Sequence, residues 1–470
     1  SFASGPCSYM DVFDTSCRTV ESAGARRGAQ LGALRVDHPD IESFIVAKRT
    51  EGRWNNFNVS VFVSDAFMNA VKNDLEWELV HKAKPTDKII EKNGSYQRED
   101  GVWVYRKVRA RDLWDTIMKS NYEFAEPGIL FEDNINNDNN LRYVEYINTT
   151  NPCAEEPLPP YGCCDLWAII LPRLVKDPFK PTASFDYDKL ADLTTKLVRF
   201  LDNALDATYW PLEQQKQEAM NKRRIGLGFT GLGNALAMMN LKYNSEAGRQ
   251  AAAIISNFIM EAAYNASVDI AIEKGPFPLF NADLYLEEAT DDKPGTFASN
   301  LSTPIKDRIR KHGIRNSHLL TIAPTGTISL AFADNASNGV EPPFSLAYMR
   351  KKRTDRDGER MYTVVDHSVR VFLSTMQNQE LAKLIEKALC EGKKEFTYNG
   401  SNYVVRNQLP ESIVTALEIT ADDHLLMLKV LRPYVDSAMS KTINVSEDYP
   451  FEDFKNIYLK AHKYSLKGVA

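Results

Sequence analysis

The stretch Asn151-Pro152-Cys153-Ala154-Glu155 decides how the rest of this chain is interpreted. It places a thiol two residues from an amide and two residues from a carboxylate. If the segment is extended, side chains at positions i, i+2 and i+4 project to the same side. The proline favours this geometry because it pushes the preceding residue out of the helical region. We therefore expect one loop to present all three groups to a small substrate; the alternative is a surface loop with a chance cysteine.

The composition is that of a soluble globular protein. The chain has 470 residues, of which 43% are hydrophobic and 26% charged, enough for one large α/β barrel or two to three domains. A net charge of −6 argues against a general nucleic-acid or membrane-surface binder. No apolar run reaches the roughly 20 residues of a membrane span, and no signal peptide is visible. Six cysteines are too few for a disulfide scaffold, which favours a reducing, cytoplasmic location.

The hydrophobic pattern predicts helices that alternate with strands. Amphipathic helices are expected at about 8–23, 65–78, 110–123, 186–206, 244–274, 420–440 and 451–467. Short strands are expected at about 31–36, 56–63, 166–171, 318–323 and 442–446. This alternation indicates an α/β fold with a largely parallel sheet. The polar, turn-rich segments 84–108 and 351–405 are expected to be peripheral excursions from a single domain.

Two common binding motifs are not favoured. Gly226-Leu227-Gly228-Phe229-Thr230-Gly231 fits the dinucleotide-binding pattern, but that pattern requires a strand before it. The preceding residues, Glu218 to Arg224, look helical and charged, so we expect close packing of a turn against a strand instead. No metal site is expected, because Cys153, Cys163 and Cys164 lack zinc-ligand spacing and the histidines are scattered.

Two other stretches suit phosphate or a nucleotide. Residues 323–329, Ala-Pro-Thr-Gly-Thr-Ile-Ser, follow an apolar strand. Hydroxyl groups, a glycine and free backbone N–H groups at a turn suit a phosphate; the alternative is a Ser/Thr-rich helix cap. In residues 22–29, two adjacent arginines framed by glycines can bind phosphate or stack on a base, although a solvated loop has the same composition.

These stretches together, in this order, resemble the adenosylcobalamin-dependent (class II) ribonucleotide reductases along essentially the whole chain. The similar segments are ASGPCSYMDVFD (3–14), SAGARRGAQLGALRVDHPDIESFI (22–45), NNFNVSVFVSDAFMNAV (55–71), TNPCAEEPLPPYGCCDL (150–166), RRIGLGFTGLGNAL (223–236), RNSHLLTIAPTGTISL (315–330), NGVEPPF (338–344) and YVDSAMSKTINV (434–445). The resemblance implies a ten-stranded α/β barrel with a central finger loop. The barrel is expected to occupy residues 1–470 as one catalytic domain and to be incomplete at both ends of this chain.

The resemblance also implies catalytic roles. Cys153 matches the cysteine that becomes a thiyl radical, generated through adenosylcobalamin, and takes the 3′-hydrogen of the ribose. Glu155 matches the base that accepts the 3′-OH proton, and Asn151 matches the amide that holds a sugar hydroxyl and orients Glu155. Cys164 matches one of two cysteines that end as a disulfide, which a thioredoxin-like dithiol then reduces.

Two binding sites are implied by the same resemblance. The substrate-phosphate site comprises Ser4, Gly5, Pro324, Thr325, Gly326, Thr327 and Ser329. The loop through which a bound deoxynucleotide effector selects the base comprises Ser22, Gly24, Arg26, Arg27 and Gly28. The implied protein is an allosteric, cytoplasmic homodimer that makes DNA precursors from ribonucleoside di- or triphosphates, without direct contact to nucleic acid or membrane.

The chain departs from the family pattern in places. Trp167 and Ala154 stand where glycine is usual, and we expect the Trp167 ring to alter packing close to Cys164. The redox partner of Cys164 and a cysteine-bearing tail are expected beyond Ser1 and Ala470. Two alternatives stay open: a reductase with the same barrel driven by a metal radical subunit or a glycyl radical, and a catalytically silent nucleotide-binding relative.

Overall fold

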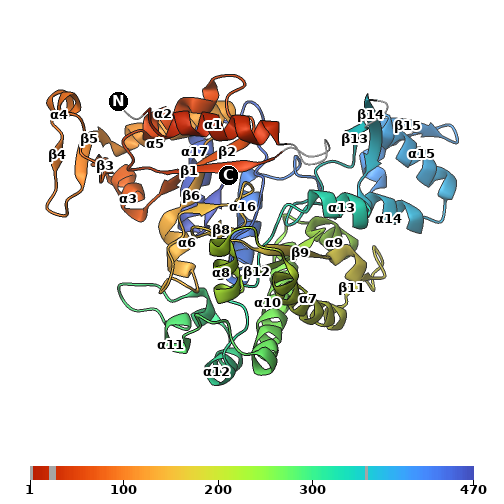
Figure 1. The fold of residues 1–470 in the computed structure, drawn as a ribbon. Helices are drawn as coiled ribbons and strands as arrows, with labels where there is room; N and C mark the ends of the chain where they lie inside the picture. Colours follow the sequence, from red (N-terminus) through yellow and green to blue (C-terminus); the bar gives the residue numbers. More distant parts are fainter. Residues whose placement is uncertain (1–3, 21–27, 355–357) are drawn as a thin grey trace. The chain divides into compact units, whose positions relative to one another are not determined.

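The computed structural model describes residues 4–20, 28–354 and 358–470, which form two compact units (Figure 1). Unit 1 comprises Ser1–Asn137, Tyr146–Pro160 and Asp448–Ala470, and unit 2 comprises Asp138–Glu145 and Tyr161–Glu447. Each unit therefore joins segments that are far apart in the sequence. The family-derived residues Ser22, Gly24, Arg26 and Arg27 lie outside the described residues.

A four-stranded sheet forms the centre of unit 1. Strand β1 (Gln30–Arg35) pairs in parallel with β2 (Phe57–Val63), β2 pairs in parallel with β6 (Gly128–Phe131), and β17 (Gly468–Val469) runs antiparallel to β6. Strand β2 is buried along its whole length except at Asn58, as its almost continuous apolar sequence predicts for a parallel strand covered on both faces. The expected strands at about 31–36 and 56–63 are thus confirmed.

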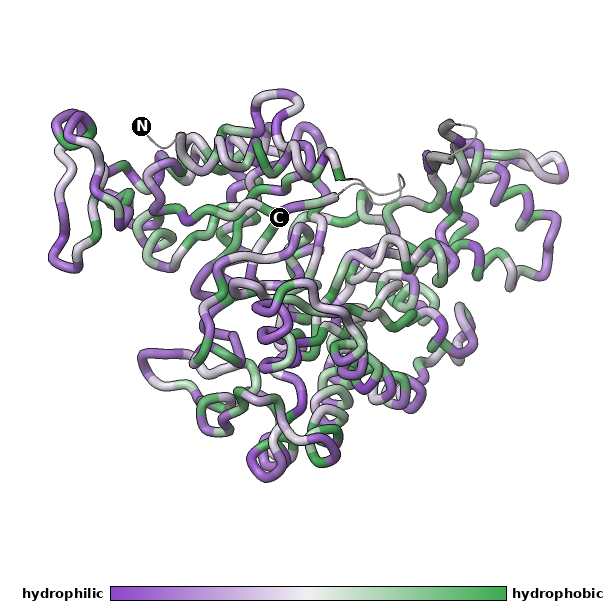
Figure 2. Tube along the Cα trace, viewed as in Figure 1, coloured by the Kyte–Doolittle hydropathy of each residue, from purple (hydrophilic) through white to green (hydrophobic). Residues whose placement is uncertain are grey.

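Helices surround this sheet, and a smaller antiparallel sheet extends from it. The remaining elements of unit 1 are α1 (Pro6–Thr19), α2 (Ile41–Val46), η1 (Ala47–Arg49), α3 (Asp65–Asn73), β3 (Glu76–His81), α4 (Asp87–Asn93), β4 (Tyr96–Gln97), β5 (Trp103–Arg109), α5 (Ala110–Phe124), α6 (Glu132–Asp138), β7 (Thr149–Thr150), β8 (Pro157–Leu158) and α17 (Phe451–Lys463). Strands β3, β5 and β4 form the smaller sheet, whose turns are mostly hydrophilic (Figure 2). The predicted excursion at 84–108 falls in this sheet.

Unit 2 contains a second parallel arrangement. Strand β9 (Asp165–Ile170) pairs in parallel with β12 (Ile225–Thr230). Residues 318–322 continue the series on the other side of β12 through a parallel bridge between Leu227 and Leu320, and a bridge between Ile322 and Met439 adds the next segment. Throughout the described residues the strands form separate sheets of two to four strands, and none of these sheets closes on itself.

The expected strands at 318–323 and 442–446 are wrong as regular strands. The carboxylate of Asp436 accepts the backbone N–H groups of Leu319 (2.8 Å) and Leu320 (2.9 Å). A side chain thus takes bonds that a neighbouring strand would otherwise take, so the ladder is reduced to single bridges. The chain then turns away at Thr442, whose N–H donates to the Glu341 carboxylate at 2.6 Å.

Helices and hairpins complete unit 2. They are η2 (Leu171–Leu174), β10 (Val175–Lys176), β11 (Ser184–Phe185), α7 (Tyr187–Ala207), α8 (Glu213–Lys222), α9 (Leu232–Met238), α10 (Glu246–Lys274), α11 (Ala282–Tyr285), η3 (Phe297–Asn300), α12 (Thr303–His312), α13 (Gly326–Phe332), β13 (Ala347–Thr354), β14 (Gly358–Val365), α14 (His367–Thr375), α15 (Gln379–Cys390), β15 (Glu395–Tyr398), β16 (Ser401–Val404), η4 (Val405–Gln408), α16 (Ala421–Leu431) and η5 (Arg432–Tyr434). Helix α10 has a side-chain cap at its start, because the Ser245 hydroxyl accepts the N–H of Gly248 at 3.0 Å.

The glycine motif at 226–231 packs as its sequence context predicts. Its first five residues form strand β12, and helix α8 precedes it. A Cβ atom added at Gly228 would lie 2.1 Å from the carbonyl oxygen of Thr321, so only glycine lets residues 318–322 come this close. The motif is therefore a close-packing device in the structure.

Candidate active site

The predicted site residues are divided between the units: unit 1 contains Asn151, Cys153 and Glu155, and unit 2 contains Cys164 and residues 323–329. In unit 1, β7 and β8 pair antiparallel, Thr149 with Leu158 and Thr150 with Pro157. This short ladder closes a tight loop that carries the candidate catalytic groups.

Residues 151–156 form a turn, so the expectation of an extended segment is wrong. The Asn151 side-chain oxygen accepts the N–H of Glu156 at 3.0 Å, and its backbone oxygen accepts the N–H of Ala154 at 3.0 Å. Ala154 adopts a positive φ of 64°, a region that costs most L-residues about 1–2 kcal/mol. Glycine adopts that conformation without strain, in keeping with the glycine that the resemblance leads us to expect there.

The turn nevertheless brings the amide and the carboxylate together. Glu155 is only 3% exposed, and burial raises the pKa of its carboxyl, while a hydrogen bond from Asn151 opposes that rise. A carboxylate with a raised pKa accepts a proton more readily near neutral pH than an ordinary glutamate does. Asn151 and Glu155 thus form a candidate base and its orienting partner.

Cys153 lies at the exposed part of the same turn. The carbonyl oxygen of the preceding Pro152 accepts a hydrogen bond of 2.8 Å from the side chain of Asn58 on β2, which ties the turn to the central sheet. Sequence reasoning missed Asn58; its signal was an amide side chain within a largely apolar strand. The thiol is therefore accessible on a turn that is held in place by a hydrogen bond to strand β2.

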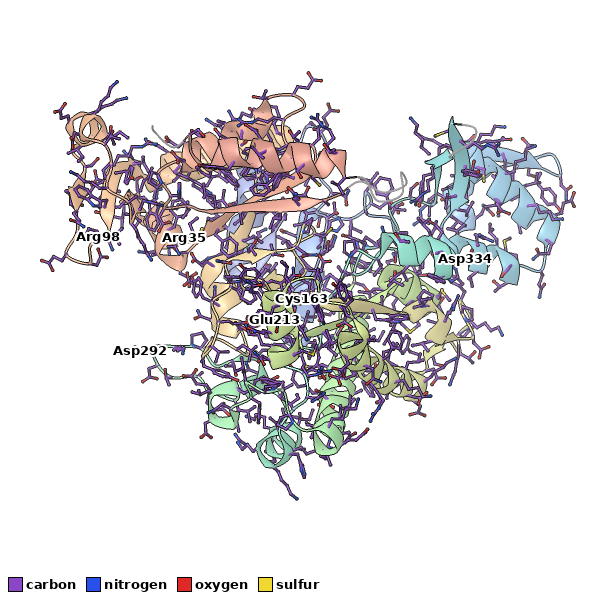
Figure 3. All side chains as sticks on the ribbon, in the orientation of Figure 1. Arg35, Arg98, Cys163, Glu213, Asp292 and Asp334 are labelled. Carbon is purple, nitrogen blue, oxygen red and sulfur yellow. The ribbon has the colours of Figure 1, made fainter. Side chains whose placement is uncertain are left out.

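In unit 2, Cys163 and Cys164 directly precede strand β9. The Cys163 thiol faces helix α8, with its sulfur 3.9 Å from the carbonyl oxygen of Gln215 (Figure 3), and burial raises its pKa to about 11. Because side chains alternate along extended chain, Cys163, Asp165 and Trp167 share one face and Cys164 projects to the other. The Trp167 ring packs against Phe200 of α7, with ring centroids 4.9 Å apart, so it adds bulk on the face opposite Cys164.

The predicted phosphate loop contains one exposed and two internally bonded hydroxyl groups. Thr325, at a φ of 55°, donates its hydroxyl to Thr230 at 2.8 Å and accepts the N–H of Gly339 at 2.8 Å. The Ser329 hydroxyl donates to the carbonyl oxygen of Ala336.

Thr327, by contrast, is exposed. It lies in the first turn of α13, where the N–H groups lack intrahelical partners. No side chain caps this helix, so the helix-cap alternative is not supported.

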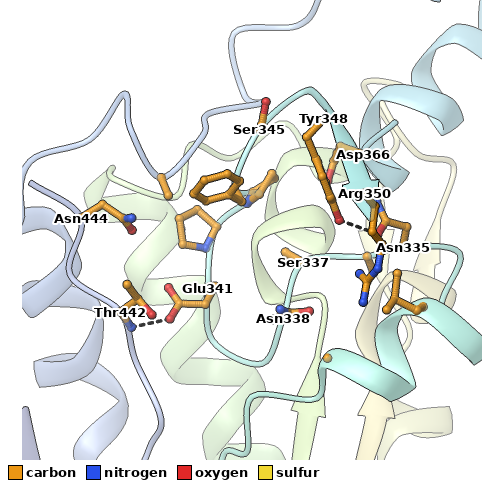
Figure 4. Close-up of a pocket in the computed structure, with 17 residues that line it drawn as sticks. Asn335, Ser337, Asn338, Glu341, Ser345, Tyr348, Arg350, Asp366, Thr442 and Asn444 are labelled. Carbon is orange, nitrogen blue, oxygen red and sulfur yellow. Dashed lines mark hydrogen bonds between the residues drawn. The ribbon is translucent and has the colours of Figure 1, made fainter. Parts of the chain in front are cut away.

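A cavity of about 390 Å³ adjoins this loop (Figure 4). Its lining residues come from α13, the 335–345 loop, β13, the segment after Met439 and two single positions, Asp366 and Ala416: Gly326, Leu330, Asn335, Ala336, Ser337, Asn338, Glu341, Pro342, Pro343, Phe344, Ser345, Tyr348, Arg350, Asp366, Ala416, Thr442 and Asn444. Glu341 is fixed from behind by the buried Lys441, whose ammonium group donates to it at 2.6 Å. This carboxylate and its lysine were not predicted as a site, although both lie in segments that carry the family resemblance.

Three of the remaining predicted residues lie in unit 1. Gly5 caps α1 with a φ of 84° and lies beside the Asp40 carboxylate, and the backbone oxygen of Ser4 accepts the Ser8 hydroxyl at 3.1 Å. Gly28 lies against Cys17, where an added Cβ would be 2.5 Å from the sulfur. These contacts fix backbone positions and do not test phosphate or effector binding.

Across residues 4–20, 28–354 and 358–470, no three His, Cys, Asp or Glu side chains gather closely enough to hold a metal ion. Within the same ranges, no helix has both the length and the apolar character that crossing a membrane demands.

Comparison with known proteins places the chain in a family. The model of the ribonucleotide reductase barrel domain matches residues 1–470, and the chain belongs to this family. It is 33% identical over 468 residues to a vitamin B12-dependent ribonucleoside-diphosphate reductase of Thermoplasma acidophilum, covering 99% of this chain and 54% of that protein.

Two further relatives have similar names. A vitamin B12-dependent ribonucleoside-diphosphate reductase of Mycobacterium tuberculosis is 32% identical over 99% of this chain and 59% of its own length. A vitamin B12-dependent ribonucleotide reductase of Streptomyces coelicolor is 28% identical over 100% of this chain and 50% of its own length. The chain thus spans about half the length of the curated relatives it matches.

Proposed function

We propose that the protein reduces ribonucleotides to 2′-deoxyribonucleotides by a thiyl-radical mechanism that depends on adenosylcobalamin. The observation that carries the proposal is the 151–156 turn, which combines an accessible thiol with a buried carboxylate bonded to an amide. Membership of the reductase family and the names of its relatives support it. In this proposal the turn is the finger loop of a ten-stranded α/β barrel, and residues 1–470 form one catalytic domain.

The groups of the turn take separate roles. Cys153, as a thiyl radical, removes the 3′-hydrogen of the ribose, and its S–H bond returns a hydrogen atom at the end. Glu155 accepts the 3′-OH proton, which its raised pKa favours. Asn151 holds a sugar hydroxyl and orients Glu155 through the hydrogen bond between their side chains.

The accessible Cys153 thiol fits a radical source that must reach it from outside the turn. Adenosylcobalamin, when bound, supplies the radical that starts the reaction. Cys153 and Glu155 then transfer the hydrogen atoms and the proton named above.

Cys164 supplies one of the two thiols needed for reduction. Two thiols give two electrons and two protons: the 2′-OH leaves as water, the sugar gains hydrogen, and the thiols end as a disulfide. An external thioredoxin-like dithiol reduces this disulfide for the next turnover. Cys163 is the less suitable candidate, because its sulfur faces α8 and burial raises its pKa to about 11.

Phosphate binding in the proposal involves Ser4, Gly5 and the 323–329 loop. Thr327 is the exposed hydroxyl there, and the first-turn N–H groups of α13 are available for hydrogen bonds to phosphate oxygens. In the same proposal, residues 22–29 let a bound deoxynucleotide effector select the base, and the enzyme acts as a homodimer.

The decisive experiment compares Cys153→Ala with wild type in the full-length enzyme, with adenosylcobalamin and a dithiol. The variant should form no deoxynucleotide and should bind the ribonucleotide with an unchanged dissociation constant, because the thiol is a reactant and not a binding group. Chromatography of the products and equilibrium binding measure the two quantities. Deoxynucleotide formation by the variant would overturn the radical assignment. If wild type turns over with a metal radical subunit and without cobalamin, the protein is a ribonucleotide reductase of the class driven by such a subunit.

A further inference from the structure

Asp165 is a buried carboxylate without a partner side chain. It is the first residue of β9 and directly follows Cys164. Neither of its carboxylate oxygens is exposed, and neither accepts a hydrogen bond from any other residue of the described chain.

The charges that face Asp165 are already balanced among themselves. Asp202 of α7 is fully buried and accepts hydrogen bonds from the guanidinium groups of Arg223 (2.7 Å) and Arg315 (3.2 Å). Arg223 also donates to the Asp206 carboxylate at 2.9 Å. Two carboxylates therefore pair with two guanidinium groups, and no cation of this cluster remains for Asp165.

An ionised Asp165 would add an uncompensated negative charge to this cluster. A buried charge without a partner costs several kcal/mol, and such a group takes up a proton instead. In agreement, burial raises the pKa of Asp165 to about 7, and the neighbouring Asp202 adds to the rise, whereas the residue's own N–H and the charge of Arg223 oppose it. On its own face, Cys163 is the other titratable neighbour.

We infer that Asp165 is a positioning residue that holds the start of β9, and with it the Cys164 thiol, only while its carboxyl is protonated. Ionisation drives the carboxylate towards water and away from Asp202, which displaces the chain at the residue that follows Cys164. The inference deepens the proposed function, since it makes delivery of electrons by Cys164 sensitive to pH near neutrality.

The test measures the reactivity of Cys164 directly. Full-length wild type, Asp165→Asn and the control Asp192→Asn are treated with iodoacetamide at several pH values between about 5.5 and 9, and modification of Cys164 is followed by peptide mass spectrometry. Asp192 lies on α7 in an exposed pair with Lys196, so the control removes a carboxylate from the same helix without touching the cluster. The asparagine variant has the shape of the protonated acid and cannot ionise.

The rate of Cys164 alkylation in wild type, divided by the rate in Asp165→Asn, should be near one at low pH. This ratio should change by about threefold or more across a midpoint near pH 7. The ratio of wild type to Asp192→Asn should stay constant. A constant ratio for Asp165→Asn as well would overturn the inference. Turnover should follow the same pattern. The kcat of wild type should fall as pH rises above neutrality, the kcat of Asp165→Asn should not, and KM should be the same for both. Because alkylation needs no turnover, failure of the enzyme to reduce ribonucleotides would refute the proposed function separately.

Discussion

Substitution of Gly228 by alanine should loosen unit 2 at the strand that leads into the 323–329 loop. The added Cβ would lie 2.1 Å from the Thr321 carbonyl oxygen and 3.3 Å from the Ile322 Cα. Both neighbours are backbone atoms, so the two segments must separate by roughly 1 Å to reach ordinary contact distance. Overpacking of this kind costs about 1–3 kcal/mol. Weakening the adjoining bond from the Thr321 N–H to the Leu227 oxygen, 3.1 Å long, adds about 1 kcal/mol.

Urea denaturation of the Gly228→Ala variant should therefore show a loss of about 2–4 kcal/mol in unfolding free energy, with an unchanged m-value. Gly326→Ala is the matched stability control, because nothing lies within 4 Å of the Cβ that it adds; its change should be below about 0.5 kcal/mol. A Gly228→Ala variant as stable as this control would refute the reasoning, since it would mean that the strands do not meet as described.

Three other substitutions test the site. Thr327→Val should raise the KM for the ribonucleotide about ten- to a hundredfold, which corresponds to the loss of one hydrogen bond to a charged phosphate, about 1.5–3 kcal/mol. Thr325→Val should mainly lower the unfolding free energy, because its hydroxyl bonds within the protein. Steady-state kinetics and denaturation separate the two effects, and an equal rise in KM for both variants would contradict the assignment of Thr327 as the exposed hydroxyl. Glu155→Gln should gain thermal stability over wild type as pH rises above the unfolded-state pKa of about 4. The reason is that a raised folded-state pKa makes ionisation of Glu155 destabilise the fold. A stability difference between variant and wild type that does not change with pH would count against burial of the carboxyl. Cys164→Ser should permit hydrogen exchange or base release from the substrate without deoxynucleotide, and full activity in that variant with loss in Cys163→Ser would shift the assignment by one residue.

Each of the seven helices expected from the sequence overlaps a helix of the described residues, but several of their ends were misplaced. The helix expected at 65–78 is α3, which ends at Asn73 because Asp74 adopts a left-handed conformation and the following residues pair with β5. The helix expected at 420–440 ends at Leu431, close to Pro433, which cannot continue it. Pairing with a distant strand is invisible to a helical periodicity, whereas the proline was a readable stop.

Long-range polar contacts explain what the sequence could not reveal. The segment 318–323 has the composition of a strand, yet its ladder is interrupted by Asp436, more than a hundred residues later. The turn at 151–156 likewise depends on the Asn151 side chain folding back onto Glu156, whereas alternation alone predicted an extended segment. In both cases a side chain competes successfully with regular backbone pairing, which no periodic pattern records.

Substitutions on the two faces of β9 have different consequences for the packing around Cys164. Trp167 differs from the usual glycine, yet its ring packs sideways on Phe200, on the face that Cys164 does not share. A change at position 167 is accommodated by Phe200 of α7, so this position can vary without repacking the side of β9 to which Cys164 projects. Members of this family can therefore differ at outward-facing positions close to Cys164 while the packing on the side of β9 to which that thiol projects stays the same.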